Sequence, residues 1–296
     1  MTDVKGKVAV VTGAGSGIGR ALAYELARRG AKLAVSDVDT TGLAETVKQV
    51  KVIGAPVHHA RLDVTDRAAV LSYADEIAVE FGAVNLVFNN AGIAFTGDIH
   101  EMSFDDIERV IDVDFWGVVH GTKAFLPHLI ASGEGHVVNI SSLFGLLAVP
   151  GQSAYNAAKF AVRGFTEALR QEMLLAGHDV HVTCVHPGGI KTAIARNAGA
   201  VASQNAAELA QFFDSKLAKT SPDAAARIIL RAVENNRPRA VVGFDAKLLD
   251  VAVRVLGPAY QRLFVLGAAR LMPRHTAQAA PIAPTPAANG RTRTSA

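Results

Sequence analysis

The sequence predicts an α/β protein built on one parallel sheet, with helices wound onto both of its faces. Short apolar runs alternate with longer helical patterns along most of the chain, which is the order typical of β–α–β units. A glycine-rich stretch joins the first apolar run to the first helical pattern, as expected for the sharp strand-to-helix turn of a doubly wound fold. The apolar content of 50% and the charged content of 19% suit a folded globular chain of 296 residues.

The expected strands are short apolar runs that are bounded by turn residues. They are Lys7–Thr12, Lys32–Ser36, a strand that ends before Asp63, Val84–Phe88, His136–Ile140, Asp179–Val185 and Arg239–Gly243. The first expected helix is Gly17–Arg29, which Gly30 would end. Two long helical patterns follow, Phe104–Ala131 and Ser153–Ala176, and both are more apolar than a helix facing solvent requires. Part of each is therefore expected to face another helix or a second subunit.

Composition divides the chain into three parts. Residues 1–245 are expected to form the single doubly wound domain, 246–274 a helical extension, and 275–296 a disordered tail rich in Ala, Pro and Thr. Within the domain, residues 193–220 are rich in Ala, Asn, Gln and Ser, which predicts a mobile segment beside a substrate site. The extension is too charged and interrupted to span a bilayer. Three uses stay open for it, in this order: covering a hydrophobic pocket, docking on a partner subunit, or peripheral contact with a membrane surface.

The charge pattern gives no indication of a nucleic-acid partner. Three of the 30 basic residues are arginines beyond Met272, and the other 27 balance 27 acidic residues. The sequence pI near 9.0 therefore reflects the tail more than the body of the protein. No basic stripe of the kind that binds phosphate backbones is present in the body. A small molecule is the expected partner.

Cysteine and histidine usage argues against disulfides and metal. Cys184 is the only cysteine, so no internal disulfide can form, and a single free thiol fits a reducing cytoplasm. The apolar run Val8–Val11 is too short for a signal peptide and leads straight into glycines. His178, His181 and His186 cluster in sequence, but on a strand positions 181 and 186 face opposite sides, and no carboxylate or cysteine completes a metal-ligand spacing.

The first chemical signal is Thr12–Gly19 (TGAGSGIG), which lies directly after the first strand and opens a helix. Glycines let the backbone turn tightly and approach a pyrophosphate, whose charge then sits at the helix N-terminus. The residues expected to contact a dinucleotide here are Gly13, Gly15, Ser16, Gly17, Ile18 and Gly19.

An aspartate at the end of the second strand indicates which dinucleotide is bound. Asp37 could accept both hydroxyls of an adenosine ribose and would repel a 2′-phosphate; the alternative is a solvated loop carboxylate. Ser16 supports the first interpretation, because no arginine or lysine stands in the glycine loop to hold a phosphate. Lys32 is weak evidence for the opposite. NAD is therefore favoured over NADP.

The second chemical signal is a tyrosine and a lysine four residues apart, Tyr155 and Lys159. On a helix these positions share a face, so the ammonium can lower the pKa of the phenol toward a useful range. The pair is common by chance. However, Ser142 lies thirteen residues upstream of Tyr155 and follows an expected strand, at the sheet edge where ligands bind. Its hydroxyl could hold a substrate oxygen while Tyr155 exchanges the proton.

Taken together, these motifs resemble those of the short-chain dehydrogenases/reductases. The match runs in register over roughly Lys5–Thr192 and more weakly to about Gly243. Its pieces are Thr12–Gly19, Asp63-Val64, Asn89-Asn90-Ala91-Gly92, Ser142, Tyr155 with Lys159, and Pro187-Gly188 followed by Thr192. Each piece is modest alone, but their order and spacing together are specific. The resemblance implies a Rossmann-like nicotinamide-dependent oxidoreductase that forms a homodimer or homotetramer through its two long helices.

The resemblance also implies a role for each matching residue. Tyr155 would be the proton donor and acceptor, Lys159 would bind the nicotinamide ribose, and Ser142 would polarise the substrate carbonyl. The remaining cofactor contacts would come from Asp63 and Val64 at the adenine, Asn90 and Gly92 along the cofactor, and Pro187, Ile190 and Thr192 at the carboxamide.

One position departs from the family pattern. The family usually has an asparagine in an Asn-x-x-Gly pattern before the serine strand, where it helps to hold a proton relay; this chain has Asp114, three residues before Gly117. A carboxylate accepts hydrogen bonds but cannot donate as an amide does, and its charge opposes phenolate formation at Tyr155. Either the relay works in a variant form, which is favoured, or it is impaired.

The sequence is thus interpreted as an enzyme that oxidises a secondary alcohol or reduces a ketone with NAD(H). Apolar residues after the serine favour a lipophilic substrate, unless they simply belong to the core: Leu143, Phe144, Leu146, Leu147 and Val149. Two alternatives stay open. One is an NADP-dependent ketone reductase, and the other is a nicotinamide-binding regulatory protein without turnover.

Overall fold

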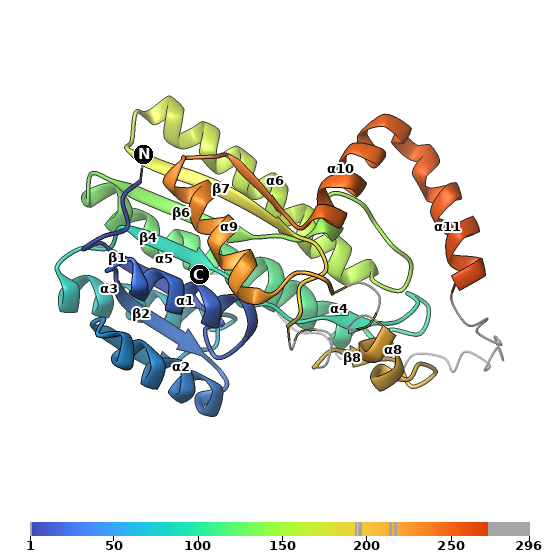
Figure 1. The fold of residues 1–296 in the computed structure, drawn as a ribbon, viewed down its shortest axis with the longest axis horizontal. Helices are drawn as coiled ribbons and strands as arrows, with labels where there is room; N and C mark the ends of the chain where they lie inside the picture. Colours follow the sequence, from blue (N-terminus) through green and yellow to red (C-terminus); the bar gives the residue numbers. More distant parts are fainter. Residues whose placement is uncertain (1, 193, 195–196, 213–214, 216–217, 272–296) are drawn as a thin grey trace, which may run out of the picture. The chain divides into compact units, whose positions relative to one another are not determined.

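A parallel sheet with helices on both faces forms the body of the protein. The computed structural model describes residues 2–192, 194, 197–212, 215 and 218–271. The chain separates into two compact units, Met1–Pro258 and Ala259–Ala296. In the described part of the first unit, seven strands form one sheet in the order β3-β2-β1-β4-β6-β7-β9, and each pairs parallel to its neighbours (Figure 1). The doubly wound α/β fold expected from the sequence is confirmed.

The strands and helices have the following bounds. The strands are β1 Val8–Thr12, β2 Lys32–Asp37, β3 Val57–Arg61, β4 Leu86–Asn89, β5 Phe95–Thr96, β6 Gly135–Ile140, β7 Val180–Pro187, β8 Gly199–Ala200 and β9 Arg239–Val242. The α-helices are α1 Gly17–Arg28, α2 Thr40–Ile53, α3 Arg67–Phe81, α4 Phe104–Ile111, α5 Gly117–Ala131, α6 Ser153–Ala176, α8 Ala206–Phe212, α9 Pro222–Glu234, α10 Phe244–Leu256 and α11 Tyr260–Leu271. At most of these element ends, the expected and observed bounds differ by no more than two residues. Helix α6 matches its expected range.

Two apolar layers hold the helices against the sheet. One layer packs α1, α2 and α9 against one face, and the other packs α3, α5 and α6 against the opposite face (Figure 1). Because both faces are covered, the central strands β1, β4 and β6 are buried along their whole lengths. This explains why they are continuous apolar runs in the sequence rather than alternating ones.

The strand order reverses between β1 and β4. From β1 the chain adds β2 and β3 on one side, and it then crosses back to place β4 on the other side. At such a reversal the loops that follow the two strands diverge and leave a crevice at the carboxyl edge of the sheet. The glycine-rich loop follows β1, and Asn90 follows β4, so both border this crevice.

The expected helix Phe104–Ala131 is instead interrupted by a π-helical turn. Helix α4 begins at a capping box of Ser103 and Asp106, and α5 follows after the π turn Asp112–Trp116. A π turn adds a residue to the helical repeat and is frequent at functional sites. Here it carries Asp114, whose side chain is fully buried.

Helix α10 packs against β9 in the first unit, where Asp250 pairs with Arg239 at 2.7 Å. Its opposite face exposes Phe244, Leu248 and Val255. The expected boundary between residues 245 and 246 stays a prediction, and the expected tail 275–296 lies outside the described residues, as do parts of 193–220. In the part of the chain that is described, no helix has the length and apolar character needed to cross a bilayer.

Candidate active site

The glycine loop between β1 and α1 is shaped by backbone conformations and contacts that exclude larger residues. Gly13 and Gly17 have φ values of 64° and 53°, in the left-handed region that favours glycine. A Cβ atom on Gly19 would lie 2.1 Å from the carbonyl oxygen of Gly13. Helix α1 starts after Ser16, whose side chain makes no capping hydrogen bond. The first N–H groups of α1 therefore lack a side-chain cap, as a site for a phosphate group requires.

Asn90 holds this loop from across the strand reversal. Its Nδ2 donates to the carbonyl oxygens of Thr12 and Gly13, at 2.9 and 3.2 Å. The hydroxyl oxygen of Thr12 accepts in return from the backbone N–H groups of Asn90 and Ala91. The side-chain amide expected to lie along a cofactor is thus used to fix the loop, and its role toward the cofactor stays a prediction.

Asp37 and Arg20 fix the peptide of Gly15 from its two sides. The backbone N–H of Gly15 donates to Oδ2 of Asp37 at 2.7 Å, and the guanidinium of Arg20 donates to the carbonyl of Gly15. Arg20 also donates to the carbonyl of Gly42 and to the hydroxyl of Thr46, both at 3.0 Å. The guanidinium of Arg20 therefore hydrogen-bonds with other parts of the protein. Sequence reasoning missed Arg20, because a lone arginine in a helix gives no distinctive signal.

Ser142, Tyr155 and Lys159 converge at the carboxyl end of β6. Ser142 follows β6, while Tyr155 and Lys159 lie one turn apart on α6. The Lys159 ammonium is 5.4 Å from the centre of the Tyr155 ring, and its Nζ donates to the carbonyl of Ile140 at 3.3 Å. The hydroxyl of Ser142 hydrogen-bonds with Tyr155, and its oxygen accepts from the N–H of Phe144 at 3.1 Å. The structure thus brings the three expected catalytic residues together.

Asp114 is joined to the same cluster through Lys159. One carboxylate oxygen, Oδ1, accepts from the N–H of Ile93 at 2.7 Å, and the other, Oδ2, lies 3.3 Å from Nζ of Lys159. Both side chains are buried, so this ion pair is shielded from water. Gly92 leaves the room for it, because a Cβ there would lie 3.2 Å from Oδ1 of Asp114 and 3.4 Å from the Lys159 ammonium.

These contacts act on the pKa values in opposite directions. Burial and the Asp114 charge raise the pKa of the Tyr155 phenol, whereas the Lys159 charge and the Ser142 hydrogen bond lower it; burial has the largest effect. The pKa of Tyr155 therefore lies above its ordinary value. Burial also raises the pKa of Asp114, against the attraction of Lys159. For Lys159, burial lowers the pKa, but the charges of Asp114 and Tyr155 outweigh it, so the ammonium stays protonated. The site therefore contains a cation that is already paired.

The remaining expected cofactor residues lie around the same crevice. Thr192 meets the glycine loop directly, since a Cβ on Gly17 would lie 3.1 Å from its methyl group. Asp63 is exposed and accepts from the backbone N–H of Thr65 at 2.9 Å. Val64 is buried against Gly117, where a Cβ would lie 2.6 Å from its side chain. Pro187 ends β7, and Ile190 is buried in the segment between it and Thr192.

An apolar cluster borders the Tyr155 side of the site. It consists of Met102, Val110, Ala154 and Val201, with Ile93, Phe95, Ile107 and Tyr155 packed against them. The parallel pair β5–β8 brings Val201 there, through hydrogen bonds from Gly199 to Ala94 and from Val201 to Thr96 at 3.1 and 3.0 Å.

The apolar residues after the serine divide between core and site. Leu143, Leu146 and Leu147 are buried, which supports the core interpretation for these three. Phe144 packs edge-on against Tyr155 with ring centres 6.1 Å apart, while Val149 is half-buried and its carbonyl accepts from the Asn156 side chain.

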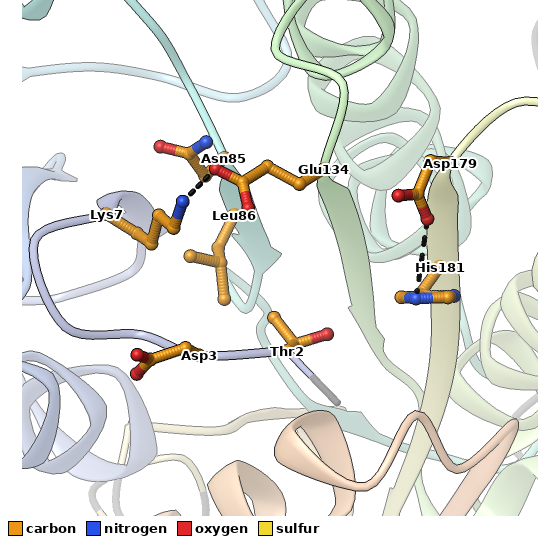
Figure 2. Close-up of a pocket in the computed structure, with 8 residues that line it drawn as sticks. All are labelled: Thr2, Asp3, Lys7, Asn85, Leu86, Glu134, Asp179 and His181. Atoms are coloured by element: carbon orange, nitrogen blue, oxygen red, sulfur yellow. Dashed lines mark hydrogen bonds and ion pairs between the residues drawn. The ribbon is translucent and has the colours of Figure 1, made fainter.

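A cleft of about 240 Å³ lies at the amino ends of the strands, and Figure 2 shows the residues that line it. Three of its charged residues, Lys7, Glu134 and Asp179, each directly precede a strand, so they lie at amino ends rather than carboxyl ends. Lys7 pairs with Glu134, and Asp179 lies 3.7 Å from His181. Because the cleft lies at the amino ends of the strands, it is separate from the site at their carboxyl ends.

Known proteins similar to this chain show the family to which it belongs. The family model described as short chain dehydrogenase matches residues 7–202. The chain belongs to the short-chain dehydrogenase family. It is therefore an NAD(P)-dependent oxidoreductase of the short-chain dehydrogenase/reductase type, as the sequence motifs indicated.

Three similar proteins place the chain within this family. SadH of Mycobacterium tuberculosis, which carries an oxidoreductase assignment, is 62% identical over 273 residues, covering 92% of this chain and 99% of SadH. Human estradiol 17-beta-dehydrogenase 11 is 36% identical over 196 residues, covering 66% of this chain and 65% of its own. A crystal structure of a Burkholderia phymatum short-chain dehydrogenase/reductase in complex with NAD superposes with a TM-score of 0.82 at 36% identity, covering 88% of this chain and 97% of that one.

Proposed function

We propose that the protein oxidises a secondary alcohol, or reduces the corresponding ketone, by hydride transfer with NAD(H), using Tyr155 as the acid/base. The observation that carries this proposal is the convergence of Tyr155, Lys159 and Ser142 at the carboxyl edge of the sheet. That edge also holds the glycine loop, so a bound dinucleotide would present its reactive end to the tyrosine.

The residues present fit a dinucleotide. The uncapped start of α1 provides N–H groups for the pyrophosphate, and the residues placed around the crevice would hold the two ends: Asp37, Asp63 and Val64 the adenosine, and Gly92, Pro187, Ile190 and Thr192 the nicotinamide. When bound, the nicotinamide would supply the acceptor or donor of the hydride.

Tyr155 moves the proton in this scheme. In oxidation its phenolate removes the hydroxyl proton of the substrate, and in reduction its phenol returns a proton to the carbonyl oxygen. Ser142 holds that oxygen through its hydroxyl, which already hydrogen-bonds with Tyr155. Lys159 favours the phenolate, and Asp114 opposes it. We propose that the Asp114–Lys159 pair is a working variant of the family's relay, in which the carboxylate keeps the ammonium in place.

NAD is proposed over NADP because of what surrounds Asp37. Its carboxylate stands at the end of β2 against Gly15, where a 2′-phosphate would meet a like charge. Arg20, the nearest cation in the sequence after the loop, is engaged with carbonyls and with Glu45 at 3.0 Å. The NAD complex of the Burkholderia protein supports the same choice. Asp37→Ser should raise the ratio of kcat/KM for NADPH over NADH by about tenfold or more; an unchanged ratio would contradict this role.

A lipophilic substrate is proposed because apolar side chains border Tyr155. The cluster around Met102 and Val201 offers no charge to a substrate, and Phe144 presents its ring beside the tyrosine. The name of the human relative identifies an apolar steroid alcohol as its substrate. The expected order of preference is therefore apolar secondary alcohols above short hydrophilic ones.

The test is turnover on a panel of secondary alcohols with NAD⁺, and of ketones with NADH. The wild-type protein should turn over apolar members of the panel. Tyr155→Phe should lose at least about 1,000-fold in kcat while keeping its affinity for NADH, measured by fluorescence titration. Tight NADH binding, no turnover on the panel and no difference between wild type and Tyr155→Phe would instead support a regulatory binding protein, the alternative that Asp114 motivates.

We also propose that the protein is a cytoplasmic homodimer or homotetramer that pairs through its long helices. Helix α6 exposes Phe160, Leu174 and Leu175, with exposed fractions of 40%, 67% and 89%. An apolar face of this kind is commonly covered by a partner helix. Sedimentation analysis should give a dimer or larger species, and Phe160→Glu should shift it toward the monomer.

A further inference from the structure

His186 lies next to the proposed active site but takes no part in the proposed proton transfer. It is on β7, directly before Pro187, and its side chain is fully buried. Its Nδ1 lies 3.0 Å from the backbone carbonyl oxygen of Ser142. A carbonyl oxygen can only accept, so Nδ1 carries the hydrogen and donates it. This contact fixes the neutral tautomer in which Nε2 has no hydrogen.

The same carbonyl oxygen also closes the turn that follows the serine. It accepts from the backbone N–H of Gly145 at 3.0 Å, which forms the 3₁₀ turn Leu143–Gly145. The turn rests on α6, because the Ser141 hydroxyl donates to the carbonyl of Lys159 at 2.8 Å. A Cβ on Gly145 would lie 2.3 Å from that hydroxyl and 2.6 Å from that carbonyl. The turn therefore has little room to move toward Lys159.

The other ring nitrogen of His186 has no structural use. Nε2 is buried and has no hydrogen-bond partner among the described residues. Burial lowers the pKa of His186 to about 4, although the bond to Ser142 acts the other way, so the ring is neutral near pH 7. A leucine here would fill a similar volume without an unpartnered nitrogen. The histidine therefore has one polar function in the structure, the hydrogen bond that Nδ1 donates.

We infer that His186 is a positioning residue for the reaction: its Nδ1–H holds the Ser142 carbonyl and thereby keeps the Ser142 hydroxyl directed at Tyr155. The carbonyl fixes the plane of the peptide after Ser142, and that peptide leads to the N–H of Phe144 that binds the serine oxygen at 3.1 Å. With its oxygen held in this way, the Ser142 hydroxyl is free to donate toward the site. This inference rests on the proposed function, because it assigns His186 to that reaction.

The test compares variants that keep or remove the donor. An asparagine places its Nδ2 where histidine has Nδ1, whereas a glutamine amide reaches to the position of Nε2. His186→Leu should lower kcat about 10- to 100-fold with less than about a threefold change in the KM for NADH. His186→Asn should recover most of that loss, and His186→Gln should not.

A double-mutant cycle distinguishes positioning from general damage. In a Ser142→Ala background, His186→Leu should lower kcat by less than about threefold, because the group it positions is already gone. The matched control is His136→Leu, which removes a buried histidine of β6 that contacts Thr2 and Thr183; it should lower stability and leave kcat unchanged.

Equal kcat for His186→Leu and wild type, or equal losses in the wild-type and Ser142→Ala backgrounds, would overturn the inference. If His186→Leu does not fold, the ranking of His186→Asn above His186→Gln decides it, because both variants keep a polar amide. These outcomes are separate from the proposed function. Turnover by Tyr155→Phe at the wild-type rate would refute that function, whereas an inactive Tyr155→Phe with a fully active His186→Leu would refute only the role of His186.

Discussion

Asp114→Asn removes a negative charge from the centre of the site with little change in shape. The carboxylate lies 3.3 Å from the Lys159 ammonium, which in turn lies 5.4 Å from the centre of the Tyr155 ring. The carboxylate is therefore within about 9 Å of the ring, and at an effective dielectric constant near 20 its repulsion of the phenolate is on the order of 1–2 kcal/mol. Removing it should favour the phenolate by about that much.

The expected result is a pH profile for oxidation that rises at lower pH. Below the midpoint of that profile, kcat/KM should increase about tenfold, since 1.4 kcal/mol corresponds to that factor. The assay is oxidation of the best alcohol substrate at saturating NAD⁺, over a range of pH in buffers of constant ionic strength. Asp112→Asn is the matched control, because it removes an exposed carboxylate from the same π turn.

Two results would refute this reasoning. A profile that stays in place, or that moves equally for Asp112→Asn, would show that the carboxylate does not act on the phenol through its charge. A loss of activity greater than about 100-fold would show that Asp114 has a specific role beyond opposing the phenolate. The second result would be expected if its Oδ1 bond to Ile93 and its pairing with Lys159 are both needed to hold the lysine.

The stability of the protein should depend on the packing at Gly121 and on two buried histidines. Gly121→Ala should lower the free energy of unfolding, measured by chemical denaturation, by roughly 1–3 kcal/mol, because a Cβ there would lie 2.1 Å from Oδ1 of the buried Asn89. Gly164→Ala on α6, where a Cβ meets nothing within 4 Å, should be neutral or stabilising. Acidification should unfold the protein, because burial lowers the pKa of His136 to about 3 and that of His186 to about 4. Both rings then bind protons more readily when unfolded, so their contribution is present above about pH 6.5 and is lost as pH falls toward 4 and 3. His136→Leu should make the free energy of unfolding less steep in pH over that interval.

Much of the fold could be predicted because its signals are local. Each central strand is a continuous apolar run, since helices cover both faces of the sheet, and α6 ends where Gly177 adopts a left-handed conformation with φ of 70°. The π turn at Asp112–Trp116 could not be predicted in this way. Its sequence is compatible with an ordinary helix, and the contacts that Asp114 makes from this turn, with Lys159 and Ile93, come from distant parts of the chain.

In the candidate site, too, some contacts could be predicted from local sequence patterns and others could not. The convergence of Tyr155, Lys159 and Ser142 could be predicted, because one pair shares a helix face and the serine follows a strand. The contacts of Arg20 and His186 could not, because each hydrogen-bonds with a backbone carbonyl far from it in the chain, that of Gly42 and that of Ser142 respectively. Hydrogen bonds to backbone place no requirement on the partner's side chain, so neither contact leaves a pattern of paired residues in the sequence.

The pairing of Lys159 with Asp114 also bears on the direction in which the site works best near neutral pH. An enzyme cannot alter the equilibrium between alcohol and ketone, but under the proposed mechanism the two directions need opposite protonation states of Tyr155. Burial and Asp114 together keep the pKa of Tyr155 above its ordinary value despite Lys159 and Ser142. At neutral pH the residue therefore carries its proton, which is the form that donates to a carbonyl. In the proposed mechanism, reduction would draw on the protonated phenol, whereas oxidation would draw on the phenolate, which the Asp114 charge disfavours.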